Sequence, residues 1–241
     1  MNIKNLSAAY GKKQILANLS FTLKSGTFTA LIGKNGSGKS TLLGCINGRI
    51  PYTGEILLED RPLDTYSPRE KAQKIGLLPQ FLPDTALTAA QLIALGRNPH
   101  TGLTGRLQPA DRDAIASAVE LTATQDLQNR AIRTLSGGER QRVYLAMLLA
   151  QDADILLLDE PTAHTDVGFT AEFLLLLRTL AETQNKTILA VLHDLNGAAT
   201  YAHELLLLDQ GRLVAPEEIE TVFGVRKVPY AEDGKTKYFY H

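Results

Sequence analysis

The sequence predicts an α/β fold with a mostly parallel central sheet, a small antiparallel β subdomain and an inserted helical subdomain. Three observations support this prediction. Four short apolar runs lie far apart along the chain, the first sixty residues read as short strands separated by turns, and residues 81–150 have a helical pattern. With 241 residues, 44% of them hydrophobic, the chain can bury one sizeable core.

The four apolar runs predict the strands of the central sheet. They lie at residues 27–32, 75–78, 155–158 and 187–192. Because none of the runs alternates polar with apolar residues, each fits a parallel strand that helices cover on both faces. Every run ends in polar or glycine-rich residues, and in open α/β sheets ligands bind just beyond the carboxyl ends of the strands. We therefore expect the four endings to converge on one crevice.

The remaining elements follow from turn and cap signals. Residues 2–8, 16–23 and 55–59 read as short strands of an antiparallel sheet. Three helices are expected in the inserted part: residues 89–95 after a Thr88 cap, residues 109–121 opened by Pro109, and an amphipathic helix at residues 138–150. We expect a single domain, 1–241, in which residues 1–80 and 151–241 form the core and residues 81–150 the helical subdomain.

Charge and cysteine content narrow the classes of function. Lys and Arg number 25 against 26 Asp and Glu, whereas nucleic-acid-binding domains usually show a basic excess, so we expect no nucleic-acid partner. The single cysteine, Cys45, excludes an intrachain disulfide and suits a reducing compartment. The N-terminus does not resemble a signal peptide, and the longest apolar runs fall far short of the roughly 20 residues that span a bilayer. We therefore expect a cytoplasmic protein.

Residues 33–40 match the phosphate-loop pattern G-x-x-x-x-G-K-[ST], between an apolar strand and a helix-like stretch. Glycines let successive backbone N–H groups face phosphates, and the helix N-terminus adds positive potential. Lys39 is expected to reach the β- and γ-phosphates, and the Ser40 hydroxyl to ligate Mg²⁺. A plain glycine-rich turn is the alternative, which the strand and helix flanks disfavour. The predicted ATP-binding residues here are Gly33, Asn35, Gly36, Ser37, Gly38, Lys39, Ser40 and Thr41, and the fold is expected to be that of a P-loop NTPase.

Asp159 and Glu160 end the third apolar run. Because side chains alternate along a strand, the two carboxylates should point in different directions and can have different roles. Asp159 is expected to hold Mg²⁺ through its water shell, and Glu160 to orient and deprotonate the water that attacks the γ-phosphate. An acidic pair at a strand end is more often merely solvated, and only the neighbouring phosphate loop favours the functional interpretation.

His193 follows the apolar run 187–192, and Gln80 lies just beyond the run 75–78. A functional role for either residue is indicated only by the neighbouring motifs. A lone histidine at a strand end is more often structural, yet at a shared crevice we expect His193 to contact the γ-phosphate. Gln80 is expected to bind Mg²⁺ and the attacking water.

Together these residues resemble the ATP-binding cassette (ABC) family. The deciding addition is the segment Leu135-Ser136-Gly137-Gly138-Glu139, which matches the family's signature motif. The order along the chain is similar too: an aromatic residue at Tyr10, the phosphate loop, Gln80, the signature, Asp159-Glu160 and His193.

The resemblance implies further roles. Tyr10 would stack on adenine, with a plain core or surface tyrosine as the alternative. Ser136, Gly137, Gly138 and Glu139 would form the signature that meets the ATP of a second copy, so that two subunits enclose two ATP molecules head to tail; an ordinary helix cap is compatible with this role. Asp166 would lie in the loop that couples the two sites. Thr165 stands where the family commonly has leucine, which leaves the packing of this loop open.

The segments that accompany the cassette in this sequence indicate which subgroup of the ABC family it resembles. No fused membrane helices, coiled-coil insertion or second cassette is present, which leaves import ahead, with a soluble ABC ATPase such as an iron–sulfur assembly factor as the alternative. Residues 95–100, 78–80 and 193–203 resemble the ATPases that import ferric siderophores, haem and cobalamin. The resemblance implies a polytopic permease as partner, an exported substrate-binding protein as indirect partner, and a peripheral location on the cytoplasmic face of the membrane.

Overall fold

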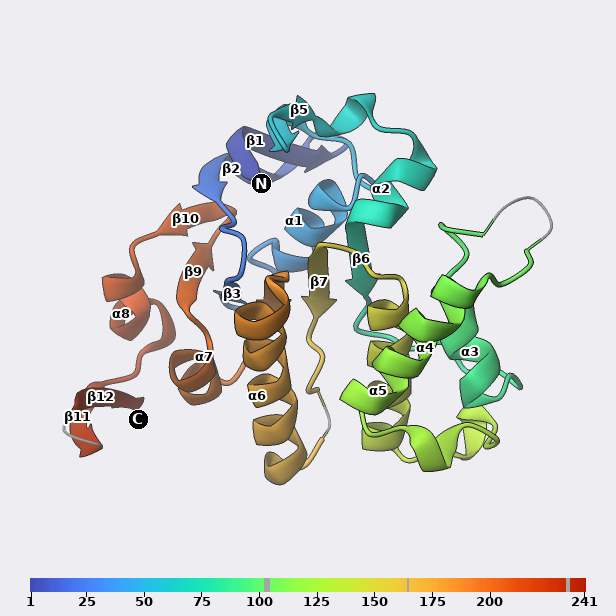
Figure 1. Ribbon diagram of the computed structural model, residues 1–241. Helices are drawn as coiled ribbons and strands as arrows, with labels where there is room; N and C mark the ends of the chain where they lie inside the picture. Colours follow the sequence, from blue (N-terminus) through green and yellow to red (C-terminus); the bar gives the residue numbers. More distant parts are fainter. Residues whose placement is uncertain (102–104, 164, 233–234) are drawn as a thin grey trace. The chain divides into compact units, whose positions relative to one another are not determined.

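The computed structural model describes residues 1–101, 105–163, 165–232 and 235–241 (Figure 1). Packing divides the chain into two compact units. The first comprises Met1–Thr65 and Ala171–His241, and the second comprises Tyr66–Thr170. Helix α6 (Val167–Gln184) begins in the second unit and continues in the first.

The first unit contains the predicted antiparallel sheet. Its strands are ordered β2-β1-β4-β5. They are β1 (Asn2–Tyr10), β2 (Lys13–Thr22), β4 (Thr53–Leu58) and the two-residue β5 (Arg61–Pro62). Apolar side chains of β1 at Ile3, Leu6 and Ala8 are buried between exposed or half-buried neighbours, as expected for a sheet with one face on a core. The three strands predicted from the first sixty residues are confirmed.

The first unit also holds parallel strands. Strand β3 (Phe28–Ile32) lies between β8 (Thr187–Val191) and β9 (Glu204–Asp209) and runs parallel to both, while β10 (Arg212–Val214) pairs with β9 in the antiparallel direction. Every residue of β3 and β8 is buried, which is the environment that their uninterrupted apolar runs predicted. Helix α1 (Lys39–Ile46) follows β3, and helix α7 (Leu195–Tyr201) follows β8.

A short helix and a hairpin end the first unit. They are α8 (Ile219–Phe223) and the antiparallel pair β11 (Lys227–Glu232) and β12 (Lys235–Tyr240). The Asn196 side chain on α7 donates to the Tyr240 carbonyl oxygen at 3.2 Å and accepts from the Tyr240 N–H at 2.8 Å. Asn196 therefore ties the hairpin to the helix that follows β8.

The second unit pairs two parallel strands and carries the helices of the predicted insertion. Strands β6 (Ile75–Leu78) and β7 (Ile155–Asp159) pair in register, with Ile75 opposite Ile155 and Leu78 opposite Leu158. The helices are α2 (Pro68–Lys74), α3 (Ala89–Leu95), α4 (Pro109–Leu121) and α5 (Gly137–Ala150). Thr88 caps α3 as predicted, because its hydroxyl accepts from the Gln91 N–H. The role of residues 81–150 as a helical subdomain stays a prediction.

Helix α5 differs from its predicted form. It begins one residue earlier, at Gly137, and from Val143 to Ala150 every residue except Met147 is buried. The helix is therefore not amphipathic along its C-terminal half. The reason is that α3, α4 and β6 all pack against it, so several faces need apolar side chains.

A buried ion pair fixes the C-terminal end of α5. Arg97 Nε lies 2.9 Å from Asp111 Oδ1, both side chains are only 7% exposed, and Arg97 Nη1 donates to the Ala150 carbonyl oxygen at 2.7 Å. Helix α3 ends at Leu95, at the predicted residue, and a Cβ atom at Gly96 would lie 2.2 Å from the Met147 carbonyl oxygen. The segment after α3 is therefore packed closely against α5.

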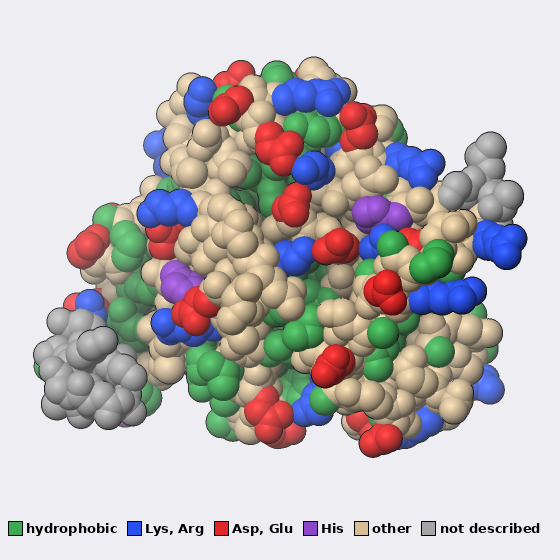
Figure 2. Space-filling model, in the orientation of Figure 1, with side chains coloured by type: hydrophobic (Ala, Val, Ile, Leu, Met, Phe, Trp, Pro, Cys, Tyr) green, Lys and Arg blue, Asp and Glu red, His purple; other side chains and the backbone are tan. Residues whose placement is uncertain are grey.

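The face of the molecule shown in Figure 2 has no dominant sign of charge. On the face shown in Figure 2, acidic and basic side chains are interspersed, which matches their nearly equal numbers in the sequence. Among the residues that the structure describes, no helix is both long and apolar enough to cross a membrane.

Candidate functional site

The phosphate loop connects β3 to α1 in the first unit. Backbone conformation or lack of space requires glycine at several of its positions. Gly36 and Gly38 have φ angles of 80° and 108°, in the region that favours glycine. A Cβ atom at Gly33 would lie 2.2 Å from the Leu208 carbonyl oxygen, and one at Gly38 would lie 2.6 Å from Leu16 Cδ2. At Gly36 a Cβ atom would meet nothing within 4 Å. The loop is thus packed on one side and open on the other.

The polar groups of the loop fit a phosphate ligand. Lys39 is 6% exposed, and its ammonium donates to the carbonyl oxygens of Gly33 at 2.8 Å and Lys34 at 3.1 Å. Among the residues that the structure describes, the buried Ser37 hydroxyl has no hydrogen-bond partner. Ser40 is exposed in the first turn of α1, where helix N–H groups and the macrodipole favour an anion. A cation, a helix N-terminus and an open backbone loop therefore lie together.

The two other predicted residues of the first unit lie at strand ends. Strand β8 is adjacent to β3, and the Leu192 N–H still donates to the Leu31 carbonyl oxygen at 3.1 Å. The exposed His193 thus follows the strand next to the one that leads into the phosphate loop. Tyr10 ends β1 opposite Lys13 at the tip of a hairpin and is 57% exposed, so its ring surface is accessible to a ligand.

Gln80 and Glu160 meet in the second unit. Each lies just beyond one of the paired strands β6 and β7, and Gln80 Nε2 donates to Glu160 Oε2 at 2.6 Å. Glu160 has a φ of 50°, a left-handed conformation that costs a non-glycine residue of order 1–3 kcal/mol and that clusters at functional sites. Asp159 is the last residue of β7 and is half-buried. The contact between the predicted base and the predicted glutamine is thus present, while convergence of all four strand ends stays a prediction.

The signature residues form the N-terminal end of α5. Ser136 Oγ accepts from the Glu139 N–H at 3.3 Å, and Glu139 Oε2 accepts from the Ser136 N–H at 2.8 Å. The bond from the Ser136 N–H lowers the pKa of Glu139, and the Arg130 guanidinium, 2.7 Å from Glu139 Oε1, lowers the pKa further. The Ser136 side chain and the Glu139 carboxylate thus form a reciprocal cap at the start of α5. Ser136 and Gly137 are exposed.

Asp166 immediately precedes helix α6. Its Oδ1 accepts from the Phe169 N–H at 2.8 Å, which caps the helix. The neighbouring Thr165 hydroxyl donates to the Thr162 carbonyl oxygen at 2.9 Å and lies 3.1 Å from the Thr170 hydroxyl. Thr165 therefore stabilises this loop through hydrogen bonds. At this position the family resemblance leads one to expect a leucine that packs against its neighbours. His164, which the sequence places in the same loop, lies outside the described residues.

Two contacts beside the predicted site were not predicted from the sequence. Arg140 Nη2 donates to the Leu82 carbonyl oxygen, and the Tyr144 hydroxyl donates to the Pro83 carbonyl oxygen. Burial raises the pKa of Tyr144, so it remains a hydroxyl donor. Both side chains come from one face of α5, four residues apart, and they fix the segment that follows Gln80. The spacing was visible in the sequence, but nothing there indicated the partner.

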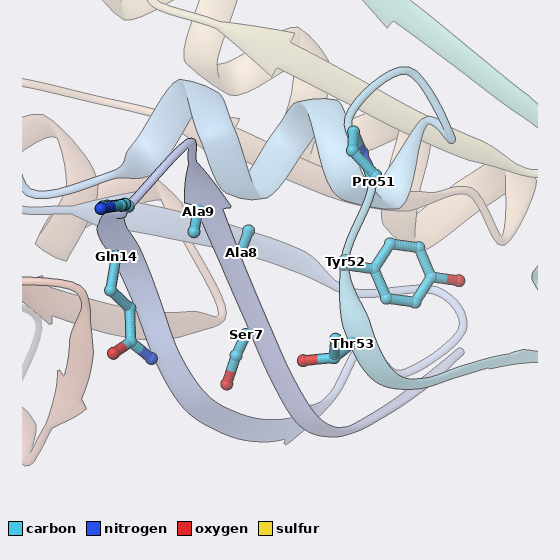
Figure 3. A pocket seen from close by; sticks show the side chains of 8 residues that line it. Ser7, Ala8, Ala9, Gln14, Pro51, Tyr52 and Thr53 are labelled. Carbon is cyan, nitrogen blue, oxygen red and sulfur yellow. The ribbon is translucent and has the colours of Figure 1, made fainter.

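A separate pocket of about 490 Å³ lies on the antiparallel sheet (Figure 3). Part of its lining comes from the β1–β2 hairpin and the rest from the segment that leads into β4. The lining residues are Ser7, Ala8, Ala9, Lys12, Gln14, Pro51, Tyr52 and Thr53. None of the predicted ATP-binding residues is among them.

The fold and the loop between β3 and α1 define a P-loop ATPase. Residues 16–163 match the sequence model of the ABC transporter family, and the chain belongs to this family. The chain is therefore an ABC-type ATPase, as the sequence predicted.

Relatives and solved structures agree with this assignment. The chain is 39% identical to the ferric enterobactin transport ATP-binding protein FepC of Escherichia coli strain K12, over 92% of this chain and 86% of the relative. It superposes on a structure described as a metal-chelate type ABC transporter in an inward-facing conformation, with a TM-score of 0.84, 26% identity, and coverage of 100% and 96%. It also matches the dimeric cassette MJ0796 bound to ADP and Pi, with a TM-score of 0.77, 28% identity, and coverage of 89% and 96%. The predicted fold class is confirmed.

Proposed function

We propose that this chain is the ATP-hydrolysing subunit of an ABC importer that takes up an iron chelate such as a ferric siderophore, haem or cobalamin through a separate permease. The observation that supports this proposal is the 39% identity to a ferric enterobactin transport ATP-binding protein over nearly the whole chain. Haem has further support from the 39% identity to the hemin import ATP-binding protein HmuV of Myxococcus xanthus strain DK1622, over 94% of this chain. Cobalamin rests on the resemblance of residues 78–80, 95–100 and 193–203 alone.

In the first unit the phosphate loop binds the triphosphate. Lys39 neutralises the β- and γ-phosphates, and the backbone N–H groups of the loop and of α1 hold the remaining phosphate oxygens. Tyr10 stacks on the base with its exposed ring, and His193 contacts the γ-phosphate. The buried position of Lys39 against the loop carbonyls supports this assignment, because its ammonium already lies within the loop.

In the second unit Glu160 acts as general base and Gln80 orients it. The 2.6 Å contact between the two side chains supports this pairing. Ser40, Gln80 and Asp159 are the proposed Mg²⁺ ligands, and their hydroxyl, amide and carboxylate oxygens are the kinds of group that Mg²⁺ prefers. When bound, Mg²⁺ neutralises charge that develops on the phosphate oxygens.

Two copies of the chain are proposed to enclose two ATP molecules. The exposed Ser136, Gly137 and the adjacent Gly138 then meet the γ-phosphate held by the partner, with Glu139 as part of the cap and Asp166 in the coupling loop. The dimeric structure of MJ0796 supports the arrangement by analogy of fold. ATP binding draws the copies together, and hydrolysis separates them.

The permease contact is proposed for the helical subdomain at residues 81–150, beginning with the segment after Gln80. The Phe81 ring is 83% exposed in this segment. An apolar partner helix would cover the ring and remove its apolar surface from water. A polytopic permease with an exported binding protein places the chain on the cytoplasmic face of the membrane. The alternative, a soluble iron–sulfur assembly ATPase, is not favoured, because the relative described above is a transport protein.

Uptake by cells tests this proposal. Cells lacking the chain should lose uptake of one of three labelled substrates, a ferric siderophore, haem or cobalamin, and regain it with the wild-type chain but not with Lys39→Ala. Unchanged uptake of all three, together with co-purification of scaffold proteins in place of a permease, would overturn the import function and leave the ATPase assignment standing.

A further inference from the structure

We propose that Phe169 is a positioning residue that holds the signature motif and the Asp166 loop together as one piece. The inference rests on the proposed two-copy function, in which both elements face the partner. A single aromatic ring would set the position of the signature motif relative to the Asp166 loop.

The ring packs against the signature helix at Gly138. A Cβ atom at Gly138 would lie 3.1 Å from Phe169 Cδ2 and 3.2 Å from Cε2, which is tighter than ordinary contact. At the neighbouring Gly137 a Cβ atom would meet nothing within 4 Å. The absence of a side chain at Gly138 therefore has a reason within this chain, namely room for the Phe169 ring.

A cation from the same helix holds the ring. The Arg142 guanidinium lies 5.4 Å from the centroid of the Phe169 ring, within the range of a cation–π interaction. Arg142 lies four residues after Gly138 and so on the same face of α5. The ring is thus in contact with two successive turns of the signature helix.

The same residue holds Asp166 through its backbone. The Phe169 N–H donates to Asp166 Oδ1 at 2.8 Å, and the Thr170 hydroxyl donates to the Asp166 carbonyl oxygen at 3.0 Å. Phe169 is only 9% exposed, although Val167, two residues earlier, is 88% exposed. A shift of the ring along α5 would therefore move the Asp166 carboxylate with it.

The simpler explanation for a buried phenylalanine is that it only fills the core. Core filling and positioning predict different effects of a substitution at Phe169. Loss of core packing lowers the unfolding temperature and leaves ATP-driven pairing of folded protein unaffected. Loss of positioning weakens that pairing at constant ATP affinity, because the phosphate loop and the signature that meets it belong to different copies.

The experiment uses the full chain carrying Glu160→Gln, in which ATP-bound dimers are expected to accumulate. Phe169→Leu and Phe169→Tyr are added separately, and two quantities are measured below the unfolding temperature: ATP affinity of the monomer and the dissociation constant of the ATP-bound dimer by analytical ultracentrifugation. We expect Phe169→Leu to weaken the dimer by about 2- to 30-fold, the usual range for a residue that couples two sites, with unchanged ATP affinity. Phe169→Tyr, which keeps the ring, should retain most of the dimer affinity.

Gly138→Ala provides a second-site test that does not depend on the stability of one variant. Added to Phe169→Leu, it should weaken the dimer less than when added to the parent, because leucine leaves room for the new methyl group. Arg142→Gln should act in the same direction as Phe169→Leu, and Arg142→Lys less so.

The outcomes separate this proposal from the proposed function. A parent that does not dimerise with ATP would overturn both. A parent that dimerises, with no effect of Phe169→Leu or Arg142→Gln and additive effects of Gly138→Ala and Phe169→Leu, would overturn the positioning role alone.

Discussion

The side-chain amide of Gln80 donates a hydrogen bond to the carboxylate of Glu160, with 2.6 Å between Nε2 and Oε2. The register of the two strands explains this contact. Leu78 pairs with Leu158 in the parallel ladder, and each of the two polar residues lies two positions beyond its leucine. The parallel pairing of β6 and β7 therefore brings the amide to the carboxylate.

Glu160→Gln should abolish most of the turnover while nucleotide binding persists. The amide keeps the shape of the side chain but cannot accept the proton of the attacking water, and loss of a general base typically costs about 10²-fold or more in rate. Phosphate release and nucleotide affinity are the measurements, and gel filtration with ATP should show a dimer. Glu217→Gln, at an exposed acidic position, is the control and should keep wild-type turnover. Wild-type turnover in Glu160→Gln would remove Glu160 from its role.

Gln80→Ala should lower turnover less than Glu160→Gln does. It removes one hydrogen bond to the carboxylate, and a bond to a charged group at the lower end of its usual range, about 1.5 kcal/mol, corresponds to a factor of about ten in rate. Steady-state kinetics should show a lower kcat. Gln73→Ala is the control, since Gln73 precedes β6, at the opposite end of the strand from Gln80, and its Nε2 donates to the Pro99 carbonyl oxygen in the same unit. Equal kcat values for Gln80→Ala and wild type would show that the contact has no part in hydrolysis.

The sequence was a sufficient guide where the signal was local. Strand β6, α3 and α4 begin and end at the predicted residues. The apolar run marks β6, Thr88 marks the start of α3, and Pro109 marks the start of α4. The phosphate loop could be identified because its glycines and Lys39 act within a few residues of one another.

The sequence could not give contacts that depend on packing between distant segments. Phe169 and Tyr144 are apolar residues of helices, and their pattern is the same whether they fill a core or contact a signature helix or a loop carbonyl. Helix α5 shows the same limit, because the number of elements that surround it decides how many of its faces are apolar. Gln80 and Glu160 were each predicted, yet their hydrogen bond follows from strand register, which composition does not encode.

Lys39→Ala should weaken nucleotide binding itself. The Lys39 ammonium lies within the loop, bonded to the Gly33 and Lys34 carbonyl oxygens, where it can transfer its charge-assisted bonds to phosphate. Such a bond contributes about 1.5–3 kcal/mol, so ATP affinity measured by calorimetry should fall by at least about tenfold. Lys34→Ala, an exposed lysine of the same loop, should change affinity little and serves as the control. Equal affinities for wild type and Lys39→Ala would contradict the phosphate-loop assignment.

Asp111→Asn should destabilise the protein in a pH-dependent way. The Gln108 N–H lowers the pKa of Asp111 below its ordinary value of 3.8, and the Arg97 guanidinium lowers it further. Because the folded state favours the carboxylate more than the unfolded state does, the stabilisation is fully present above the unfolded pKa and is lost as pH falls through the folded pKa. Near pH 7 the variant leaves Arg97 buried without its counter-charge, which should lower the unfolding temperature by roughly 5 °C or more.

Thermal unfolding between pH 3 and pH 7 measures this effect. The gap between wild type and Asp111→Asn should be constant from about pH 5 to pH 7. It should narrow below about pH 4, where Asp111 of the wild type becomes protonated in the unfolded chain before it does in the folded one. Asp113→Asn, at an exposed position of the same helix, should show a much smaller gap at every pH. A gap that stays the same at pH 3 and pH 7 would mean that the charge of Asp111 does not stabilise the end of α5.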